Sequence, residues 1–256
     1  MKRKVALITG AAKGIGKQTA ISLAKKGIHI VINYRKNEKS AYELSKYLED
    51  HFSIQTMVIQ GDVSNSSDCE SMIKKIMSVF GGVDILVHNA GPYIHERKKM
   101  SDYSLDEWNY LIHGNLTSVF YLSKLVIPYM RENQWGRIIT LGFDRAETAP
   151  AWKYRSAFSA AKTGLVSLTK TIALEEANHG ITCNMVCPGD ITTDWKEKSQ
   201  KEAWEIVDKE TPVGRPGTGE DIARVIAFLC EDESSFITGS VINITGGKDV
   251  LGKIKE

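Results

Sequence analysis

The sequence predicts an α/β fold: a single domain built on a doubly wound, mainly parallel, seven-stranded sheet with helices on both faces. Short apolar runs with strand character alternate with helical patterns along the chain. The links between them are short, which favours right-handed crossovers between parallel strands. A glycine-rich loop, Thr9–Gly16, joins the first strand to the first helix. The length of 256 residues, with 42% hydrophobic content, suits one large core.

The strands are short apolar runs, several of them of the type buried inside a parallel sheet. In chain order we expect them at Val5–Ile8, Ile28–Asn33, Gln55–Gln60, Ile85–Val87, Arg137–Leu141, Ile181–Cys187 and Ser240–Ile244. Helices are expected where apolar residues recur every three or four positions. After the glycine loop and its helix, they cover about Ser40–His51, Asp68–Phe80, a segment from Leu105, Leu116–Arg131, Ser156–Asn178, Thr192–Glu210 and Gly219–Cys230.

The loop Thr9–Gly16 has the spacing of a dinucleotide-binding motif. Gly10 permits a tight turn, Gly14 removes a Cβ where the backbone must approach a pyrophosphate, and Gly16 lets the helix pack closely on the sheet. The helix N-terminus offers free N–H groups and a positive dipole end to the phosphates. A glycine triplet alone is weak evidence. Its place between a strand and a helix favours a Rossmann-type cofactor site over an ordinary turn.

Composition limits the other classes of function. The net charge is +2 and 25% of residues are charged, which implies neither a nucleic-acid nor a membrane partner. No run approaches eighteen apolar residues, and the apolar run after the basic start is too short for a secretory signal. We therefore expect a cytoplasmic protein with a small-molecule substrate. The four cysteines lack the neighbouring ligands of a metal site and are expected to be buried.

No repeat, low-complexity tract or interdomain linker interrupts the pattern. Residues 1–256 are therefore expected to form one dinucleotide-binding domain, in which about 190–215 forms a lid over the substrate. The end of the second strand bears on the choice of cofactor. An acid there selects NAD, whereas a basic residue accommodates the 2′-phosphate of NADP. Here the strand runs into Arg35 and Lys36, and Lys13 adds a cation from the loop. This favours NADP(H), unless these are simply solvated surface charges.

Further motifs extend the similarity beyond the loop. They are Asp62-Val63, His88-Asn89-Ala90-Gly91, Asn115 in Gly-Asn-Leu-Thr, and Pro188-Gly189-Asp190-Ile191-Thr192-Thr193. By these motifs the chain resembles the short-chain dehydrogenase/reductases, most closely the 3-oxoacyl-(acyl-carrier-protein) reductase type, from Val5 to Gly247. The resemblance implies cofactor contacts from Thr9, Gly10, Lys13, Gly14, Ile15, Gly16, Arg35, Asp62, Val63, Asn89, Ala90, Gly91, Lys162, Pro188, Gly189, Ile191 and Thr193.

The catalytic pattern that the resemblance implies is incomplete. The family uses an Asn, a Ser and a Tyr-x-x-x-Lys pair, in which the ammonium lowers the phenol pKa from about 10 so that it can protonate the substrate. Asn115 and Lys162 are present, but Phe158 stands at the tyrosine position and Phe143 at the serine position. Two coordinated changes are typical of a native sequence rather than of one engineered substitution.

Two functions follow. The first is an atypical NADP(H)-dependent reductase of a carbonyl or enoyl substrate, with Asn115, Lys162 and a relocated proton donor. Tyr154 is the candidate donor, although it can instead pack the helix entrance beside Trp152, and Tyr93, Asp144 and His95 are others. The second is a catalytically impaired NADP(H)-binding sensor, or the structural partner of an active paralogue. The resemblance also implies assembly through the two long helices, as a homotetramer or as a hetero-oligomer with a paralogue.

Overall fold

The computed structural model describes residues 3–248, so residues 1–2 and 249–256 of the predicted 1–256 domain lie outside it. Seven strands form one sheet, in the order β3-β2-β1-β4-β5-β6-β7, and every neighbouring pair is parallel. The strands are β1 (Val5–Ile8), β2 (His29–Tyr34), β3 (Thr56–Gln60), β4 (Ile85–His88), β5 (Gly136–Leu141), β6 (Ile181–Pro188) and β7 (Val241–Ile244). The predicted fold class and all seven strands are confirmed.

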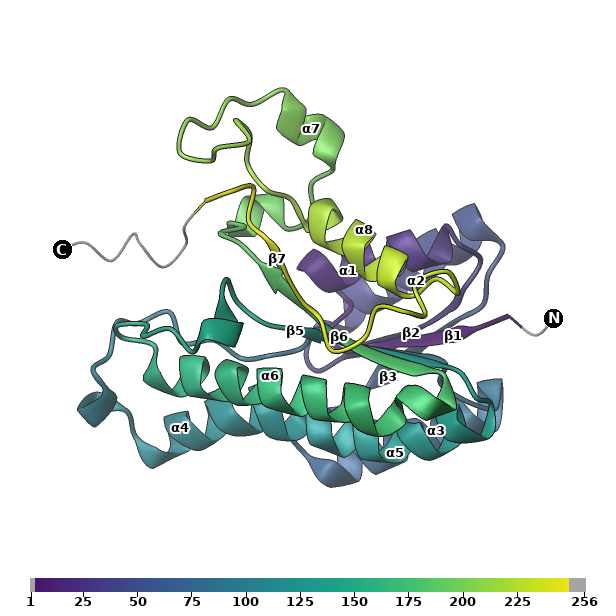
Figure 1. The fold of residues 1–256 in the computed structure, drawn as a ribbon. Coiled ribbons are helices and arrows are strands. Elements are labelled where there is room, and N and C mark those ends of the chain that lie inside the picture. Colours follow the sequence, from purple (N-terminus) through teal and green to yellow (C-terminus); the bar gives the residue numbers. More distant parts are fainter. Residues whose placement is uncertain (1–2, 249–256) are drawn as a thin grey trace.

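Helices cover both faces of the sheet (Figure 1). On one face lie α1 (Gly14–Ala24), α2 (Glu38–Phe52) and α8 (Gly219–Leu229). On the other lie α3 (Ser66–Phe80), α4 (Leu105–Ile112), α5 (Ser118–Glu132) and α6 (Ser156–Glu176). A five-residue helix, α7 (Gln200–Trp204), lies on a segment that projects beyond α8 (Figure 1).

Side chains that alternate along the strands build two separate cores. Ile8 and Ile32 point to the layer of α1, α2 and α8, where Leu23 and Ile226 are fully buried. Leu7 and Val31, one position away, point to the layer of α3, α5 and α6. Successive strand residues face opposite sides, so the continuous apolar runs serve both cores. Each fully buried Leu or Ile is worth about 1.5–3 kcal/mol, and the strand ends are held firmly.

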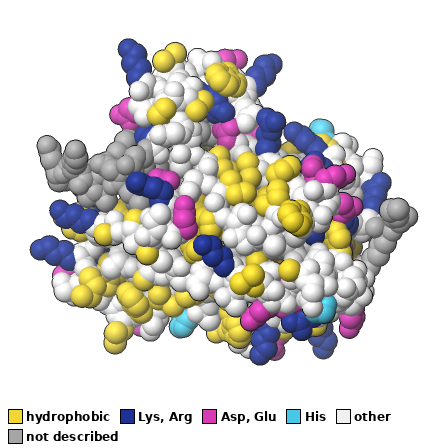
Figure 2. Space-filling model, viewed as in Figure 1, with side chains coloured by type: hydrophobic (Ala, Val, Ile, Leu, Met, Phe, Trp, Pro, Cys, Tyr) yellow, Lys and Arg dark blue, Asp and Glu magenta, His cyan; other side chains and the backbone are white. Residues whose placement is uncertain are grey.

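The strand order reverses between β1 and β4. The chain leaves β1 toward β2 and β3, then crosses back to place β4 on the other side of β1. The connections from these strands diverge there, which leaves a crevice at their carboxyl ends, the usual ligand position in such sheets. Figure 2 shows the molecule in the view of Figure 1, with charged side chains of both signs scattered over the visible surface.

The predicted helix over residues 192–210 is wrong. Only a short turn at Thr193–Trp195 and α7 are helical there. The Ser199 hydroxyl caps α7 by accepting a hydrogen bond from the Glu202 backbone. Beyond α7, the Asp208 carboxylate accepts from the Glu210 N–H at 2.9 Å and from the Thr211 hydroxyl at 2.6 Å. Side chains that bond to the nearby backbone favour caps and turns over a continuous helix.

A local irregularity separates α4 from α5. Residues His113–Thr117 form one turn of π-helix, at the point where the sequence predicts a second helix to begin, at about Leu116. Gly114 lies so close to the Pro92 ring that a Cβ there would overlap it. Such bulges allow a helix to change its register, and they occur often at functional sites. This turn carries Asn115.

Candidate functional site

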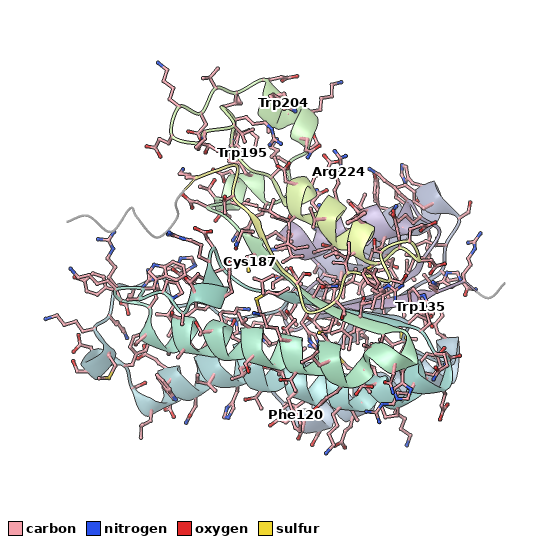
Figure 3. The ribbon with its side chains drawn as sticks, in the orientation of Figure 1. Phe120, Trp135, Cys187, Trp195, Trp204 and Arg224 are labelled. Carbon is pink, nitrogen blue, oxygen red and sulfur yellow. The ribbon has the colours of Figure 1, made fainter. Side chains whose placement is uncertain are left out.

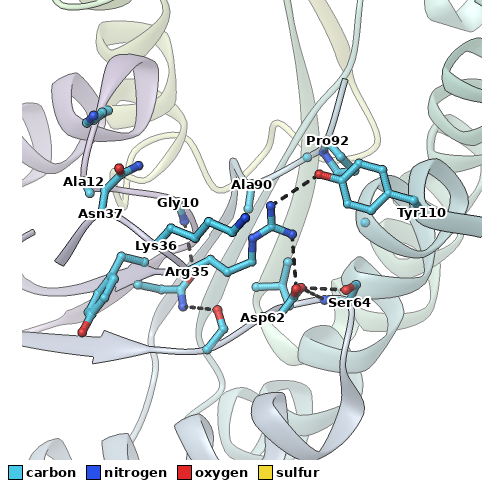
Figure 4. Close-up of a pocket in the computed structure, with 17 residues that line it drawn as sticks. Gly10, Ala12, Arg35, Lys36, Asn37, Asp62, Ser64, Ala90, Pro92 and Tyr110 are labelled. Carbon is cyan, nitrogen blue, oxygen red and sulfur yellow. Dashed lines mark hydrogen bonds and ion pairs between the residues drawn. The ribbon is translucent and has the colours of Figure 1, made fainter. Parts of the chain in front are cut away.

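A cleft of about 370 Å³ opens at the carboxyl ends of β1, β2 and β4 (Figure 4). The glycine loop forms one wall, and the segments after β3 and β4 form the other. Its lining includes nine of the predicted cofactor residues or their neighbours: Gly10, Ala12, Lys13, Arg35, Lys36, Asp62, Val63, Ala90 and Gly91. The motifs from distant parts of the sequence therefore converge on one cleft, at the point where the strand order reverses.

The backbone of the glycine loop requires its glycines. Gly10 and Gly14 have φ angles of 62° and 60°, in the left-handed region that favours glycine. A Cβ on Gly16 would lie 2.6 Å from Asn89 Nδ2 and 2.8 Å from the Gly10 oxygen. The motif therefore brings α1 against the end of β4 with no room for a larger residue.

Two asparagines fix the loop from neighbouring strands. Asn89 Nδ2 donates to the carbonyl oxygens of Thr9 and Gly10 at 2.8 and 3.1 Å. Asn33, at the end of β2, accepts from the Gly10 N–H at 3.1 Å and donates to the Gly61 oxygen at 3.1 Å. Asn33 was not among the predicted site residues. The signal available in the sequence was its position at the end of the second strand, where an acid commonly stands.

Arg35 lies across the cleft (Figure 4). Its Nη1 is 3.2 Å from an Asp62 oxygen, and its Nη2 donates to the Tyr110 hydroxyl at 3.4 Å. Burial works to raise the pKa of Asp62, but hydrogen bonds from Ser64 and Arg35 outweigh it and lower that pKa. Asp62 is thus an ionised partner of Arg35. Lys36 and Lys13 also line the cleft, so its rim is cationic.

The segment after β6 closes the far end of the site. Gly189 donates from its N–H to the Ile244 oxygen at 2.8 Å, and a Cβ there would lie 2.8 Å from Thr245 Cα. Pro188 ends β6, Ile191 packs against the core beside α1, and Thr193 begins a short helical turn. These predicted residues lie where the chain leaves the sheet, although none of them lines the 370 Å³ cleft.

Lys162 and Asn115 meet at Gly91. The Lys162 ammonium is buried and donates to the Leu141 oxygen at 2.7 Å. Asn115 Nδ2 donates to the Pro92 and Leu111 oxygens at 2.9 and 3.0 Å. A Cβ on Gly91 would lie 2.5 Å from Asn115 Oδ1 and 3.5 Å from Lys162 Nζ. Among residues 3–248, that buried Oδ1 has no hydrogen-bond partner.

Burial alone makes Lys162 unusual. Desolvation lowers its pKa to about 8, with a small opposing effect from Cys187. Nearby His88, the residue before Asn89, is also buried and donates or accepts at 3.1 Å with the Ser123 hydroxyl. Burial, helped by the Lys162 charge, lowers the pKa of His88 to about 3, so this imidazole is neutral.

The four cysteines are all free and buried, as predicted.

The two phenylalanines belong to an aromatic cluster. Phe143 packs on Trp152 at 5.0 Å between ring centroids, and Phe158 packs edge to face on Trp152 at 6.0 Å. Tyr93 meets the Phe158 ring at 5.0 Å, also edge to face. The Lys162 ammonium lies 5.7 Å from the Phe158 centroid. A phenyl ring, that of Phe158, therefore stands beside the amine where the resemblance implies the tyrosine hydroxyl.

The candidate proton donors are placed differently from one another. The Tyr93 hydroxyl receives a hydrogen bond from Arg155 Nε at 2.5 Å, in contact with the aromatic cluster. Tyr154 precedes α6 with a φ of 68°, and the Lys153 ammonium lies 5.1 Å from its ring. His95 packs on Tyr93 at 5.0 Å. Asp144 is buried next to Arg145, at 3.6 Å. Arg155, which sequence reasoning missed, joins Tyr93 to the helix entrance.

The residues present fit a dinucleotide. The helix N-terminus at Gly14 has no side-chain cap from its own N-cap residue and no acid in its first turn. Gly10 brings loop backbone without a Cβ to the cleft, and three cations, Lys13, Arg35 and Lys36, lie on its rim. In this structure the carboxylate of Glu197 accepts a hydrogen bond from the Gly14 N–H at 2.9 Å, which shows that the loop accommodates an anion.

Within residues 3–248, no group of three or more His, Cys, Asp or Glu side chains is arranged to hold a metal ion. Over the same residues, no helix has the length and apolar character needed to span a membrane.

The comparisons with known proteins agree with the fold and the motifs. Residues 10–249 match the family model described as enoyl-(acyl carrier protein) reductase. The provisionally named oxidoreductase YtkK of Bacillus subtilis is 52% identical over 249 residues, 97% of each chain. The 3-oxoacyl-(acyl-carrier-protein) reductase FabG of Escherichia coli is 37% identical over 244 residues, 95% of this chain and 96% of that one.

Solved structures are also similar. A provisionally named 3-oxoacyl-reductase from Bacillus thuringiensis superposes with a TM-score of 0.90 at 49% identity, covering 97% of this chain and 99% of the other. Acetoin dehydrogenase from Enterobacter cloacae superposes with a TM-score of 0.83 at 30% identity, covering 96% and 95%. The chain belongs to the short-chain dehydrogenase/reductase family of oxidoreductases.

Proposed function

We propose that this chain binds NADP(H) in the cleft and reduces a carbonyl or enoyl substrate with a non-standard proton donor. The cofactor assignment is supported by the cationic rim of Lys13, Arg35 and Lys36. At the end of β2 the residue that holds the loop is Asn33, which is uncharged. No carboxylate from β2 therefore opposes a 2′-phosphate, which favours NADP(H) over NAD(H). The relative named as a 3-oxoacyl-(acyl-carrier-protein) reductase supports a reductase, which needs a hydride donor.

The observation that carries the reductase assignment is the buried pair of Lys162 and Asn115. A buried amine with its pKa lowered to about 8 costs stability, and an apolar residue of similar size would not. The unpartnered Asn115 oxygen lies beside the same point. Such arrangements are typical of functional sites rather than of structural cores. Lys162 is therefore proposed to orient the cofactor ribose and to place positive charge near the reacting atoms.

The reaction needs less from the missing tyrosine when a C=C bond is reduced. The bound dihydronicotinamide would supply a hydride. The chain must then stabilise negative charge on the substrate oxygen, while a proton can reach carbon separately. Lys162 supplies the charge. Tyr93 is our first choice of donor, because Arg155 occupies only the oxygen of its hydroxyl, whose hydrogen stays available. Tyr154 remains the second choice.

The test follows NADPH oxidation with acetoacetyl and crotonyl thioesters. We expect turnover with at least one of them. Tyr93→Phe should lower kcat by about 10²-fold, the lower end of general acid effects, with NADPH affinity unchanged. Tyr154→Phe is the matched control and should change kcat little. If Tyr154→Phe has the larger effect, the donor assignments are reversed. Tight NADPH binding without turnover on a wide substrate panel would remove the reductase proposal.

A second function is favoured by the aromatic cluster. Phe143 is buried against Trp152, so phenyl packing replaces the hydroxyl that would face the substrate. A chain with this centre can hold NADP(H) as a sensor, or as the structural partner of an active paralogue. Light scattering with and without NADPH, on the protein alone and mixed with a paralogue, tests this role. A mass that changes with NADPH, in the absence of turnover, would support it.

The remaining expectations are also proposals. We propose that residues 190–215 act as a lid, since Trp195 and Trp204 lie on the segment that projects above the body of the protein (Figure 3). We further propose a homotetramer, or a hetero-oligomer with a paralogue, built on α5 and α6. Phe120 on α5 and Leu174 on α6 are both exposed, 50% and 83%, and are available for such contacts. A cytoplasmic location stays an expectation of the sequence.

A further inference from the structure

An acid from the 190–215 segment occupies part of the cofactor seat. The Glu197 carboxylate accepts from the Gly14 N–H at 2.9 Å through one oxygen. Its other oxygen pairs with the Lys17 ammonium at 2.8 Å. Gly14 and Lys17 both lie in the first two turns of α1. A side chain 183 residues away in the sequence therefore supplies the anion at the start of this helix.

The start of α1 has no anion of its own. Its first turn contains no acid, and the side chain of its N-cap residue, Lys13, makes no capping hydrogen bond. Free N–H groups and the positive dipole end attract negative charge there. Burial works to raise the pKa of Glu197, but Lys17 and the Gly14 N–H outweigh it and lower that pKa. Glu197 is thus ionised at a position where the helix terminus and Lys17 favour a negative charge.

The backbone around Glu197 is held as firmly as its side chain. Gln18 Nε2 donates to the backbone carbonyl oxygen of Glu197 at 2.7 Å. Gly219, at the start of α8, has no space for a Cβ because the Lys196 carbonyl fills it. Thr193, one of the cofactor contacts that the resemblance implies, is four residues away. The contact between Glu197 and Gly14 therefore ties this part of the segment to the start of α1.

We propose that Glu197 is an internal anion that competes with the cofactor pyrophosphate for the N-terminus of α1. It holds the 193–204 segment against α1, and cofactor binding releases it. The inference rests on the proposed NADP(H) site. The glycine motif brings the backbone at Gly14 toward a pyrophosphate, and in this structure the same N–H is bonded to a carboxylate. Two anions at one helix terminus repel each other, so occupancy by one weakens the other.

The first experiment measures NADPH affinity by intrinsic tryptophan fluorescence, to which Trp195, two residues before Glu197, contributes. Glu197→Gln keeps the shape and a hydrogen-bond acceptor but removes the charge. It should tighten NADPH binding by roughly three- to tenfold, the size of a partly exposed charge effect at a helix terminus. Glu205→Gln is the matched control. Glu205 is exposed on the same segment, and the described residues include no hydrogen bond from its side chain to α1. It should leave the affinity unchanged.

The second experiment needs no turnover. Trypsin is added to the wild-type protein with and without inorganic pyrophosphate, and cleavage is followed at Lys196, Lys198 and Lys201. Competition predicts faster cleavage with pyrophosphate, because the segment is displaced. Glu197→Gln should be cleaved faster even without it. Slower cleavage with pyrophosphate, together with weaker NADPH binding by Glu197→Gln, would overturn the proposal and make Glu197 a clamp that closes over the cofactor.

The two proposals fail in different ways. If the wild-type protein and Glu197→Gln both fail to bind NADPH, the cofactor assignment itself is wrong. If both bind NADPH with equal affinity, the assignment stands and the competition is refuted. A circular dichroism melt of each variant checks that the fold is intact, so that a lost response is not a folding defect.

Discussion

The two ends of the site differ in the kinds of side chain that form them. At the cofactor end, the loop, Asn89, Asn33 and the pair of Arg35 and Asp62 form a connected polar network. At the reactive end, the Lys162 ammonium lies beside the Phe158 ring, and the buried Asn115 Oδ1 has no partner among the described residues. In the proposed function, the adenosine part of the cofactor and proton delivery are thus handled by separate residues. One can be intact while the other is altered.

The largest expected effect comes from Lys162→Met. Removing the buried positive charge at the reactive end should lower the rate of NADPH oxidation by about 10²–10⁴-fold, the range for a positioned catalytic group. Affinity for the adenosine end of NADPH should change little, since Lys162 does not line the cleft of about 370 Å³. Stopped-flow absorbance and binding of 2′-phospho-ADP-ribose separate the two. A variant with an unchanged rate would show that Lys162 only fills space.

The next largest effect comes from introducing the two hydroxyls that the resemblance implies. Phe158→Tyr combined with Phe143→Ser should raise ketoreductase activity on acetoacetyl thioesters by about 10²-fold, the lower end for general acid catalysis. Phe143 is buried, so the double variant should lose roughly 3 kcal/mol of stability, by analogy with large-to-small changes in cores. Phe158→Tyr alone is the control that avoids the cavity.

If the double variant folds and binds NADPH but stays inactive, the geometry of the reactive end has changed beyond these two residues. Thermal melts and NADPH titration decide whether that condition is met.

A smaller effect is expected at the cofactor end from Gly16→Val. The added side chain would collide with Asn89 Nδ2 and the Gly10 oxygen, and overpacking of this kind costs about 1–3 kcal/mol. NADPH binding should weaken by roughly 10- to 100-fold as the loop is displaced. Gly217→Ala is the control, because its nearest neighbour would be 3.5 Å away, an ordinary contact. Equal affinities for the two variants would contradict the assignment of the loop.

The smallest effect is on stability and depends on pH. The pKa of Lys162 is lowered to about 8 in the folded protein, below its value in the unfolded chain. Between about pH 8 and pH 10.4 the unfolded chain binds more protons, so wild-type stability rises with pH there, by about 1 kcal/mol per pH unit at most. Below pH 8 the destabilisation is fully present and constant.

Lys162→Met lacks this contribution and should be the more stable protein at pH 7. Its advantage should shrink as the pH approaches 10. Urea unfolding of both proteins at pH 7, 8 and 9 measures the difference. A constant difference across that range would mean that the amine titrates normally and is not desolvated.

The sequence predicted the sheet well because strand burial is a local signal. Apolar runs such as Ile30–Ile32 can be recognised in the sequence itself, without knowledge of any contact to a distant segment. The 192–210 helix was wrong because its polar pattern does not reveal that Ser199 and Asp208 bond to nearby backbone. The π-helical turn at Asn115 was missed as well. It depends on the contact between Gly114 and Pro92, which lie 22 residues apart in sequence.

The same limit applies to the site. Spacing and resemblance were enough to bring the motif residues of the loop, β3 and β4 into one cleft. They could not show that Tyr93 and Trp152 pack on Phe158, that Arg155 holds the Tyr93 hydroxyl, or that Glu197 reaches Gly14. Each of these contacts joins segments that are close only after folding, and no local pattern marks them.

The most direct test of the account is a calorimetric titration of the wild-type protein with NADPH and with NADH. We predict one site per chain and NADPH binding at least about tenfold tighter, since roughly 1.4 kcal/mol from the cations at the end of β2 and in the loop is enough for that ratio. No heat of binding with either nucleotide, or tighter binding of NADH, would contradict the proposal that this cleft is an intact NADP(H) seat beside an altered reactive end.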